Sequence, residues 1–148
     1  MRLWGHPIHP MLVHFPVAFW TVATCAHLAE AAGIEAAAAL ARASNGAGLI
    51  VAALAMVAGL LELRAIESRS RAMQVATWHL MAMATAWFCF LLAWLLSISP
   101  AVAADPALAR RAGAVSAVAG FLLMGAGGWL GGRLVYEFGV GVRSGAKS

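Results

Sequence analysis

Charged residues are scarce in this chain of 148 residues. They make up 11% of it, while hydrophobic residues make up 63%, and an ordinary soluble domain carries about a quarter charged residues. So small a polar fraction cannot cover the surface of a water-soluble globule. The mean hydropathy of +0.84 agrees, and the composition therefore indicates a membrane protein whose first partner is the lipid bilayer.

Sequence motifs typical of enzymes are missing as well. The chain has no CxxC, no P-loop, no dinucleotide-binding fingerprint and no arrangement typical of a serine hydrolase. Its two cysteines, Cys25 and Cys89, lie in hydrophobic stretches, where isolated cysteines usually act as small packing residues. We therefore expect no catalytic activity from the chain alone and no disulfide.

The positive charge does not indicate a nucleic-acid partner. The formal net charge is +4, but the basic residues are spread over the ends of the hydrophobic blocks and form no patch. In a membrane protein, this distribution reports how the chain is oriented in the bilayer.

Four hydrophobic blocks are each long enough to cross a bilayer core of about 30 Å. One domain of this length accommodates them as a single up-down bundle. The predicted fold is an all-α membrane protein with four transmembrane helices, forming one domain over 1–148. The predicted spans are 8–28, 46–63, 73–97 and 112–135.

Histidine and proline are unusually dense at the start of the first span, in residues 6–16. A helix beginning at Pro16 and ending at Leu28 would be only about 20 Å long, too short to cross. A start at Pro10 gives about 28 Å, so Pro16 is expected to kink the helix. This places His14 inside the membrane.

Arginine and lysine indicate the orientation. Seven of them lie in the N-terminus, the second connection and the C-terminal tail, against three in the other two connections. The positive-inside rule then predicts that both termini are cytoplasmic.

Two histidines are expected at one depth, near the cytoplasmic end of the bundle. His14 lies one turn into the first span, and His79 lies little more than one turn into the third, on a diagonal helix. Ionisable groups within spans normally face the interior and mark function. We therefore predict a small redox subunit, with one b-type haem held between His14 and His79 as axial ligands.

Two other interpretations stay open. One is a transition-metal site, since imidazole and carboxylate suit zinc, copper or iron. The other is that the histidines are polar anchors at the headgroup level, which suits His6 and His9, and also His27 near the opposite interface. The residues considered for the metal site are His9 or His6 with His14, Glu62 and His79.

The two ends of the chain resemble the bacterial membrane family called domain of unknown function 2231. The start reads Gly5-His-Pro-Ile-His-Pro-Met-Leu-Val-His-Phe-Pro16, and the end reads Gly131-Gly-Arg-Leu-Val-Tyr-Glu-Phe-Gly-Val-Gly-Val142. Some members of that family are joined to Rieske-type iron–sulfur domains, which favours redox work, and the resemblance implies the cytoplasmic (inner) membrane of a bacterium. We expect a redox partner protein or a homo-oligomer. The resemblance implies His9, His14, Glu62 and His79 as the positions of interest.

The tail departs from the usual pattern of the family it resembles. Arg133 stands where the family has Glu, and Glu137 stands where it has Arg, an exchange that preserves a possible ion pair. Phe138 replaces a histidine, so the tail has lost a possible ligand.

Overall fold

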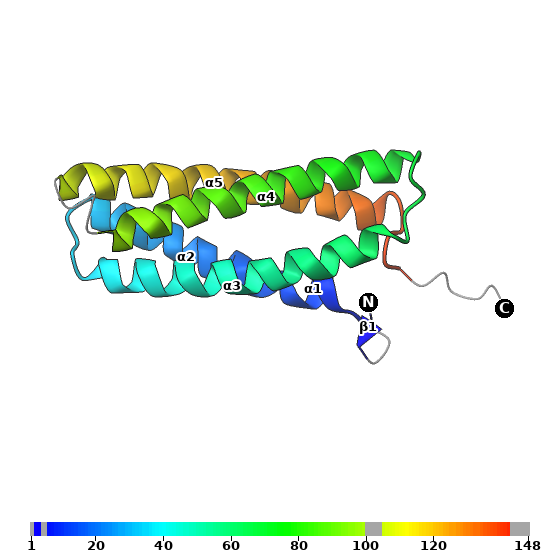
Figure 1. The fold of residues 1–148 in the computed structure, drawn as a ribbon, viewed down its shortest axis with the longest axis horizontal. Helices are drawn as coiled ribbons and strands as arrows, with labels where there is room; N and C mark the ends of the chain where they lie inside the picture. The colour runs from blue at the N-terminus through cyan, green and yellow to red at the C-terminus, as the bar shows by residue number, and fades with distance from the viewer. Residues whose placement is uncertain (1, 4–5, 100–104, 143–148) are drawn as a thin grey trace.

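The computed structural model describes residues 2–3, 6–99 and 105–142, and it confirms the four-helix fold (Figure 1). Before the first helix, two short strands, β1 (Arg2–Leu3) and β2 (His6–Pro7), pair antiparallel. The helices are α1 (Ile8–Leu12) and α2 (His14–Ala31), which together form the first span, then α3 (Ala37–Leu63), α4 (Arg71–Ile98) and α5 (Pro106–Tyr136).

Two helices begin earlier than the predicted spans. The helix α3 starts at Ala37 because the segment that precedes residue 46 is rich in alanine, the best helix former. The helix α5 starts at Pro106, which suits a first helical position, and Asp105 Oδ1 accepts a hydrogen bond from the Leu108 backbone N–H at 3.0 Å. Both extensions add polar residues to helices near one end of the bundle.

The first span is broken between α1 and α2. Val13 is a turn residue between the two helices, and Pro16 lies within the first turn of α2. Proline has no N–H for the carbonyl four residues back, and its ring collides with that carbonyl. The break one turn before Pro16 therefore has the cause that the sequence predicts, and it changes the direction in which the flanking side chains point.

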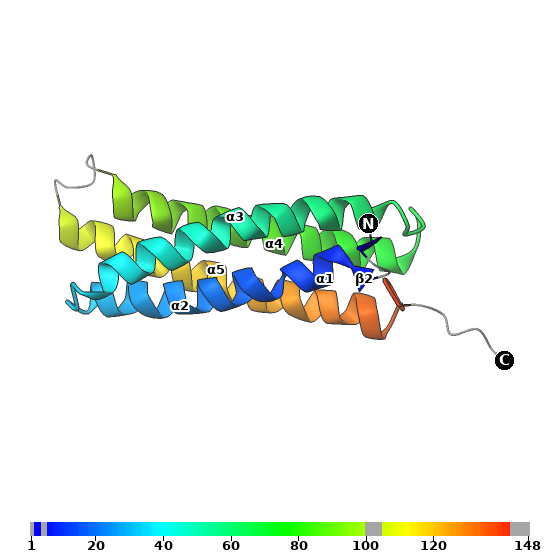
Figure 2. The same ribbon diagram turned by 90° about the horizontal axis from the view of Figure 1, so that it is seen from below.

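The helices form a closed ring of four. The helices α2 and α3 pack along one another, as do α4 and α5, and contacts between α2 and α5 and between α3 and α4 complete the ring (Figures 1 and 2). Contact is most extensive between α4 and α5 and least extensive between α3 and α4. It follows that α3 and α5 lie diagonally opposite, as do the first span and α4.

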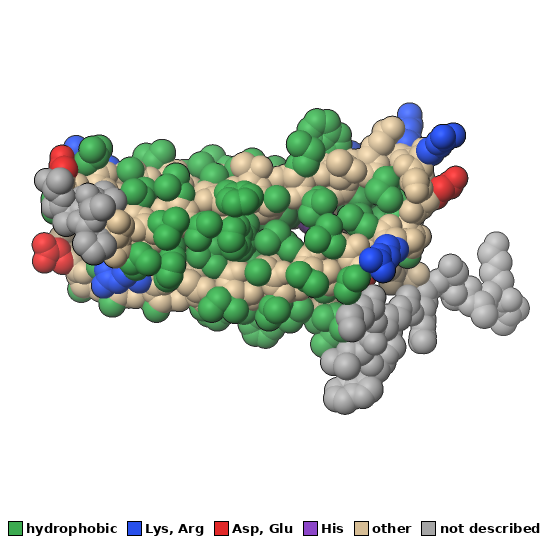
Figure 3. Space-filling model, viewed as in Figure 1, with side chains coloured by type: hydrophobic (Ala, Val, Ile, Leu, Met, Phe, Trp, Pro, Cys, Tyr) green, Lys and Arg blue, Asp and Glu red, His purple; other side chains and the backbone are tan. Residues whose placement is uncertain are grey.

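The outer surface is that of a membrane protein. All four helical segments are long and apolar enough to cross a bilayer. Large hydrophobic side chains such as Ile50 and Val115 are exposed, and charged side chains gather at the two ends of the rod (Figure 3). The apolar belt between those ends is the surface that contacts lipid.

A stacked aromatic pair fills the middle of the bundle. Trp20 of α2 and Phe90 of α4 are fully buried, with ring centroids 4.4 Å apart and planes 9° from parallel. Glycines make room for both rings: a Cβ on Gly48 would lie 2.6 Å from Trp20, and one on Gly120 would lie 2.9 Å from Phe90. Close helix approach at small residues is the usual way in which membrane bundles pack.

A methyl group at Gly48 should therefore destabilise the bundle. Gly48→Ala is expected to lower the free energy of unfolding by about 1–3 kcal/mol, the usual cost of overpacking a core. Gly128→Ala is the matched control, because nothing lies within 4 Å of a Cβ there. Both changes gain the same helix propensity. The difference in the free energy of unfolding between the two variants, measured in detergent, therefore reports the cost of the clash at Gly48. Equal stability of the two variants would contradict the close contact.

Candidate functional site

Two histidines face each other near one end of the bundle. His9 belongs to α1 and His79 to α4, and their ring centroids lie 6.3 Å apart with the ring planes at 89°. Both side chains are half-buried. The two imidazoles are thus close enough to bind one ligand between them.

Each imidazole is anchored to a backbone carbonyl. His9 Nδ1 lies 2.7 Å from the Ala55 carbonyl oxygen of α3, and His79 Nδ1 lies 2.7 Å from the Gly127 carbonyl oxygen of α5. A carbonyl oxygen only accepts, so Nδ1 must carry the hydrogen in both rings. In the neutral rings, the lone pair of Nε2 is then available to a ligand.

Glycine backs both rings. A Cβ on Gly59 would lie 3.0 Å from His9 Nδ1, and one on Gly131 would lie 3.3 Å from His79 Cε1. Met83, one turn after His79, also packs on α5, since its sulfur would lie 2.5 Å from a Cβ on Gly127. These small residues let the imidazoles lie directly against the neighbouring helices.

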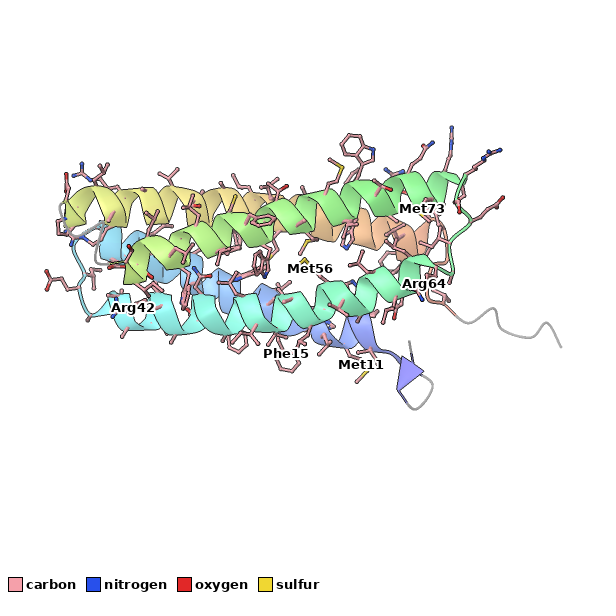
Figure 4. The ribbon with its side chains drawn as sticks, viewed as in Figure 1. Met11, Phe15, Arg42, Met56, Arg64 and Met73 are labelled. Atoms are coloured by element: carbon pink, nitrogen blue, oxygen red, sulfur yellow. The ribbon has the colours of Figure 1, made fainter. Side chains whose placement is uncertain are left out.

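The side chains between α3 and α4 leave a hollow on this side of the molecule, where these helices touch least. Figure 3 shows it with histidine at its floor. In Figure 4, Met56 points from α3 into the space between α3 and α4, whereas Met11 and Phe15 point outward, and both of those are more than half exposed. The hollow thus opens toward the lipid-facing side of the bundle between α3 and α4.

The partner of His79 is His9, and the interior orientation expected for His14 is wrong. His14 is exposed as the first residue of α2. It lies on α2, beyond the break at Val13, whereas His9 lies on α1, so the two side chains belong to separate helical segments. The kink predicted from Pro16 was the signal in the sequence that His9 and His14 point in different directions.

Glu62 and His6 complete the list of predicted positions. Glu62 is half-buried and follows Gly59 by three residues on the same face of α3, toward the same end of the bundle. The backbone of His6 lies in β2, and its side chain is outside the described part of the structure. Within residues 8–99 and 105–142, no three His, Cys, Asp or Glu side chains are grouped closely enough to hold a metal ion.

A second polar cluster lies at the opposite end, around His27. This side chain is 2% exposed and Asn45 is fully buried, although the sequence predicts that His27 is an anchor at the membrane surface. Asn45 Nδ2 lies 3.3 Å from His27 Nε2 and donates to the Phe90 carbonyl oxygen at 3.1 Å. Asn45 precedes the predicted second span, so its burial follows from the earlier start of α3.

The exchanged residues of the tail form an ion pair. The guanidinium of Arg133 donates to both carboxylate oxygens of Glu137, at 2.8 Å each, and lies 5.2 Å from the ring centroid of Trp129. The hydrogen bond from Arg133, aided by its charge, lowers the pKa of Glu137 below its ordinary value. The reversed charges therefore preserve a pair at the end of α5.

A family model described as "Predicted membrane protein (DUF2231)" matches residues 5–144. The chain belongs to this family, and the resemblance of its two terminal motifs is confirmed. No match was found among curated proteins or among solved structures.

The Arg133–Glu137 pair predicts a dependence of stability on pH. Because the pKa of Glu137 is lowered in the folded protein, the pair stabilises the fold at neutral pH and loses this effect as the pH falls through that lowered pKa. The Tm of the natural protein should exceed that of Glu137→Gln at pH 7, and the two should converge in acid. A Tm difference that does not change with pH would show that the ion pair contributes nothing.

Proposed function

We propose that this DUF2231 protein binds one b-type haem between His9 and His79 and acts as a small electron-transfer subunit of the membrane. The observation that carries the proposal is the pair of facing imidazoles, each with Nδ1 held by a backbone carbonyl. Haem iron with two histidine ligands needs this arrangement, with one imidazole on either side of the macrocycle.

The spacing of the rings fits axial ligation. Metal–imidazole bonds are about 2 Å long, so two such bonds plus the two ring radii put the centroids roughly 6 Å apart. The separation of 6.3 Å between His9 and His79 matches this requirement. The porphyrin supplies four of the six iron ligands, and the protein has to supply the other two.

The hydrogen bonds of the two rings support the same role. Histidines that bind metals almost always donate the other ring N–H to a carboxylate, a carbonyl or water, which fixes the tautomer and makes the ligand more basic. Ala55 and Gly127 provide these carbonyls. The two anchors also tie α1 to α3 and α4 to α5, so they hold the imidazoles in place before any ligand binds.

The surroundings supply room for a flat apolar ring. The hollow between α3 and α4 adjoins the histidines (Figure 3), and Gly59 and Gly131 bring no side chain against the imidazoles. Met56 and Met83 offer flexible apolar surface that adapts to an irregular partner. A haem entering between α3 and α4 would lie between the two imidazole rings.

Two axial histidines leave iron with no open position for a substrate, so the chemistry supplied would be one-electron transfer. In this proposal the chain does not catalyse a reaction alone and passes electrons to a partner protein or to a second copy. The excess of Arg and Lys at the end of the bundle with the histidine pair supports an orientation in which that end faces the cytoplasm.

A single transition-metal ion between the same imidazoles is the second candidate. Glu62 lies on the same face of α3 as Gly59, against which His9 packs, although its carboxylate and the two imidazoles are not grouped closely enough to hold an ion as they stand. Imidazole and carboxylate together suit zinc, copper or iron. In this alternative, His9 and His79 would be the nitrogen ligands.

Absorption spectroscopy of the purified protein tests the haem. Protein supplied with haem should show a Soret band that shifts on reduction, and His9→Ala and His79→Ala should each lower haem binding about tenfold or more, since loss of even a ligand's hydrogen-bond partner costs about 10–100-fold. His14→Ala is the matched control and should bind haem normally, because its side chain is exposed.

Two kinds of result would overturn the proposal of haem binding. One is a His9→Ala protein that keeps a normal Soret band, or loss of the band in His14→Ala alone. The other is a colourless protein that retains one metal ion per chain and releases it in the His9 and His79 variants, which would establish the single-ion site instead.

A further inference from the structure

A pocket of about 170 Å³ opens at the end of the bundle opposite the histidine pair. It lies where α2 and α4 end and α5 begins, which is the depth of the lipid headgroups in a protein of this length. Its polar lining comes from α2, α4, α5 and the residue that follows α4. It consists of His27, Glu30, Ser97, Ser99 and Arg110.

His27 presents an N–H group to this pocket. The Phe90 carbonyl only accepts, so the Asn45 atom beside it must be the amide nitrogen, and the second hydrogen of that nitrogen points to His27 Nε2. His27 Nε2 is therefore the acceptor and Nδ1 carries the hydrogen. His27 therefore has the same tautomer as His9 and His79, with the hydrogen on Nδ1, but here the Nε2 lone pair is occupied and the Nδ1–H faces the pocket.

The pocket also holds opposite charges that do not meet. Glu30 is 12% exposed, and its carboxylate lies 3.9 Å from His27 Nδ1. Arg110 is on α5, and within the described residues no ion pair joins it to Glu30. Charges brought this far from water are costly unless an opposite charge compensates them. Glu30 and Arg110 do not pair with each other. A ligand between them that carries both charges would pair with each.

We propose that this pocket binds a zwitterionic group that carries a primary ammonium and an oxyanion. Glu30 accepts hydrogen bonds from the ammonium. Arg110 binds the oxyanion in its two-pronged geometry, assisted by the hydroxyl of Ser99, since the Ser97 hydroxyl already donates to the Trp94 carbonyl oxygen. His27 donates its N–H at the closed side of the pocket. A phosphoethanolamine lipid headgroup has this chemistry and lies at this depth, and small amino-acid-like solutes share it.

Thermal unfolding of the full-length protein in detergent tests the proposal without any need for haem. Phosphatidylethanolamine should raise the Tm by roughly 5 °C near saturation, and phosphatidylglycerol with the same acyl chains should not, because it lacks the ammonium. Native mass spectrometry should show one phosphatidylethanolamine retained per chain in preference to phosphatidylglycerol. Soluble glycerophosphoethanolamine separates the sources: stabilisation by it identifies a water-borne ligand, and stabilisation by the lipid alone identifies a lipid site.

Matched variants locate the site. Glu30→Gln and Arg110→Gln should abolish the preference for phosphatidylethanolamine, whereas Glu35→Gln and Arg111→Gln, which make the same changes at exposed neighbouring positions, should keep it. Equal stabilisation by the two lipids would overturn the proposal. So would Glu30 and Arg110 variants that behave like their controls, in the Tm shift and in the retained lipid.

Discussion

Every polar group inside this bundle has to find its partner within the protein, because the bilayer core offers no water. The structure meets much of this demand with side chains of one helix that bind backbone carbonyls of another, whereas Trp20 Nε1 and Asn45 Oδ1 are buried with no hydrogen-bond partner among the described residues. His79 binds Gly127 on α5, Trp87 donates to Leu49 on α3, and Ser116 donates to Cys89 on α4. Such bonds tie neighbouring helices together where hydrophobic attraction between them is weak. The same bonds decide which ring nitrogen of each histidine is left to bind something else.

The stacked Trp20 and Phe90 divide the interior into two polar ends. Both rings are fully buried, and the Phe90 backbone also accepts the hydrogen bond that orients Asn45 and, through it, His27. The histidine pair at one end has free lone pairs, which suit a metal, whereas His27 at the other end has a free N–H, which suits an acceptor. In each histidine, the hydrogen-bond partner of one ring nitrogen therefore decides whether the other nitrogen can accept or donate.

The architecture could be predicted from the sequence because long apolar blocks leave few alternatives in a membrane. His79 was found for the same reason, as an ionisable residue well inside a span. His9 was predicted only for the metal site and by the family resemblance, and His27 only as a surface anchor, because their surroundings depend on where helices break and begin. The turn at Val13 separates His9 from His14, although the predicted first span was one continuous helix through both. The start of α3 at Ala37 buries Asn45 beside His27. Helix boundaries are the features that sequence patterns fix least.

The position of His9 has a consequence for how a ligand would act on the fold. The helix α1 has five residues and no fully buried side chain, and so short a helix is not stable alone. Its attachment to α3 rests on the bond between His9 and Ala55 and on the close approach at Gly59. A metal centre bound by His9 and His79 would link α1 to α4 as well, across the side of the ring where α3 and α4 touch least. Ligand binding would then stabilise the least-supported element and the weakest helix contact at the same time.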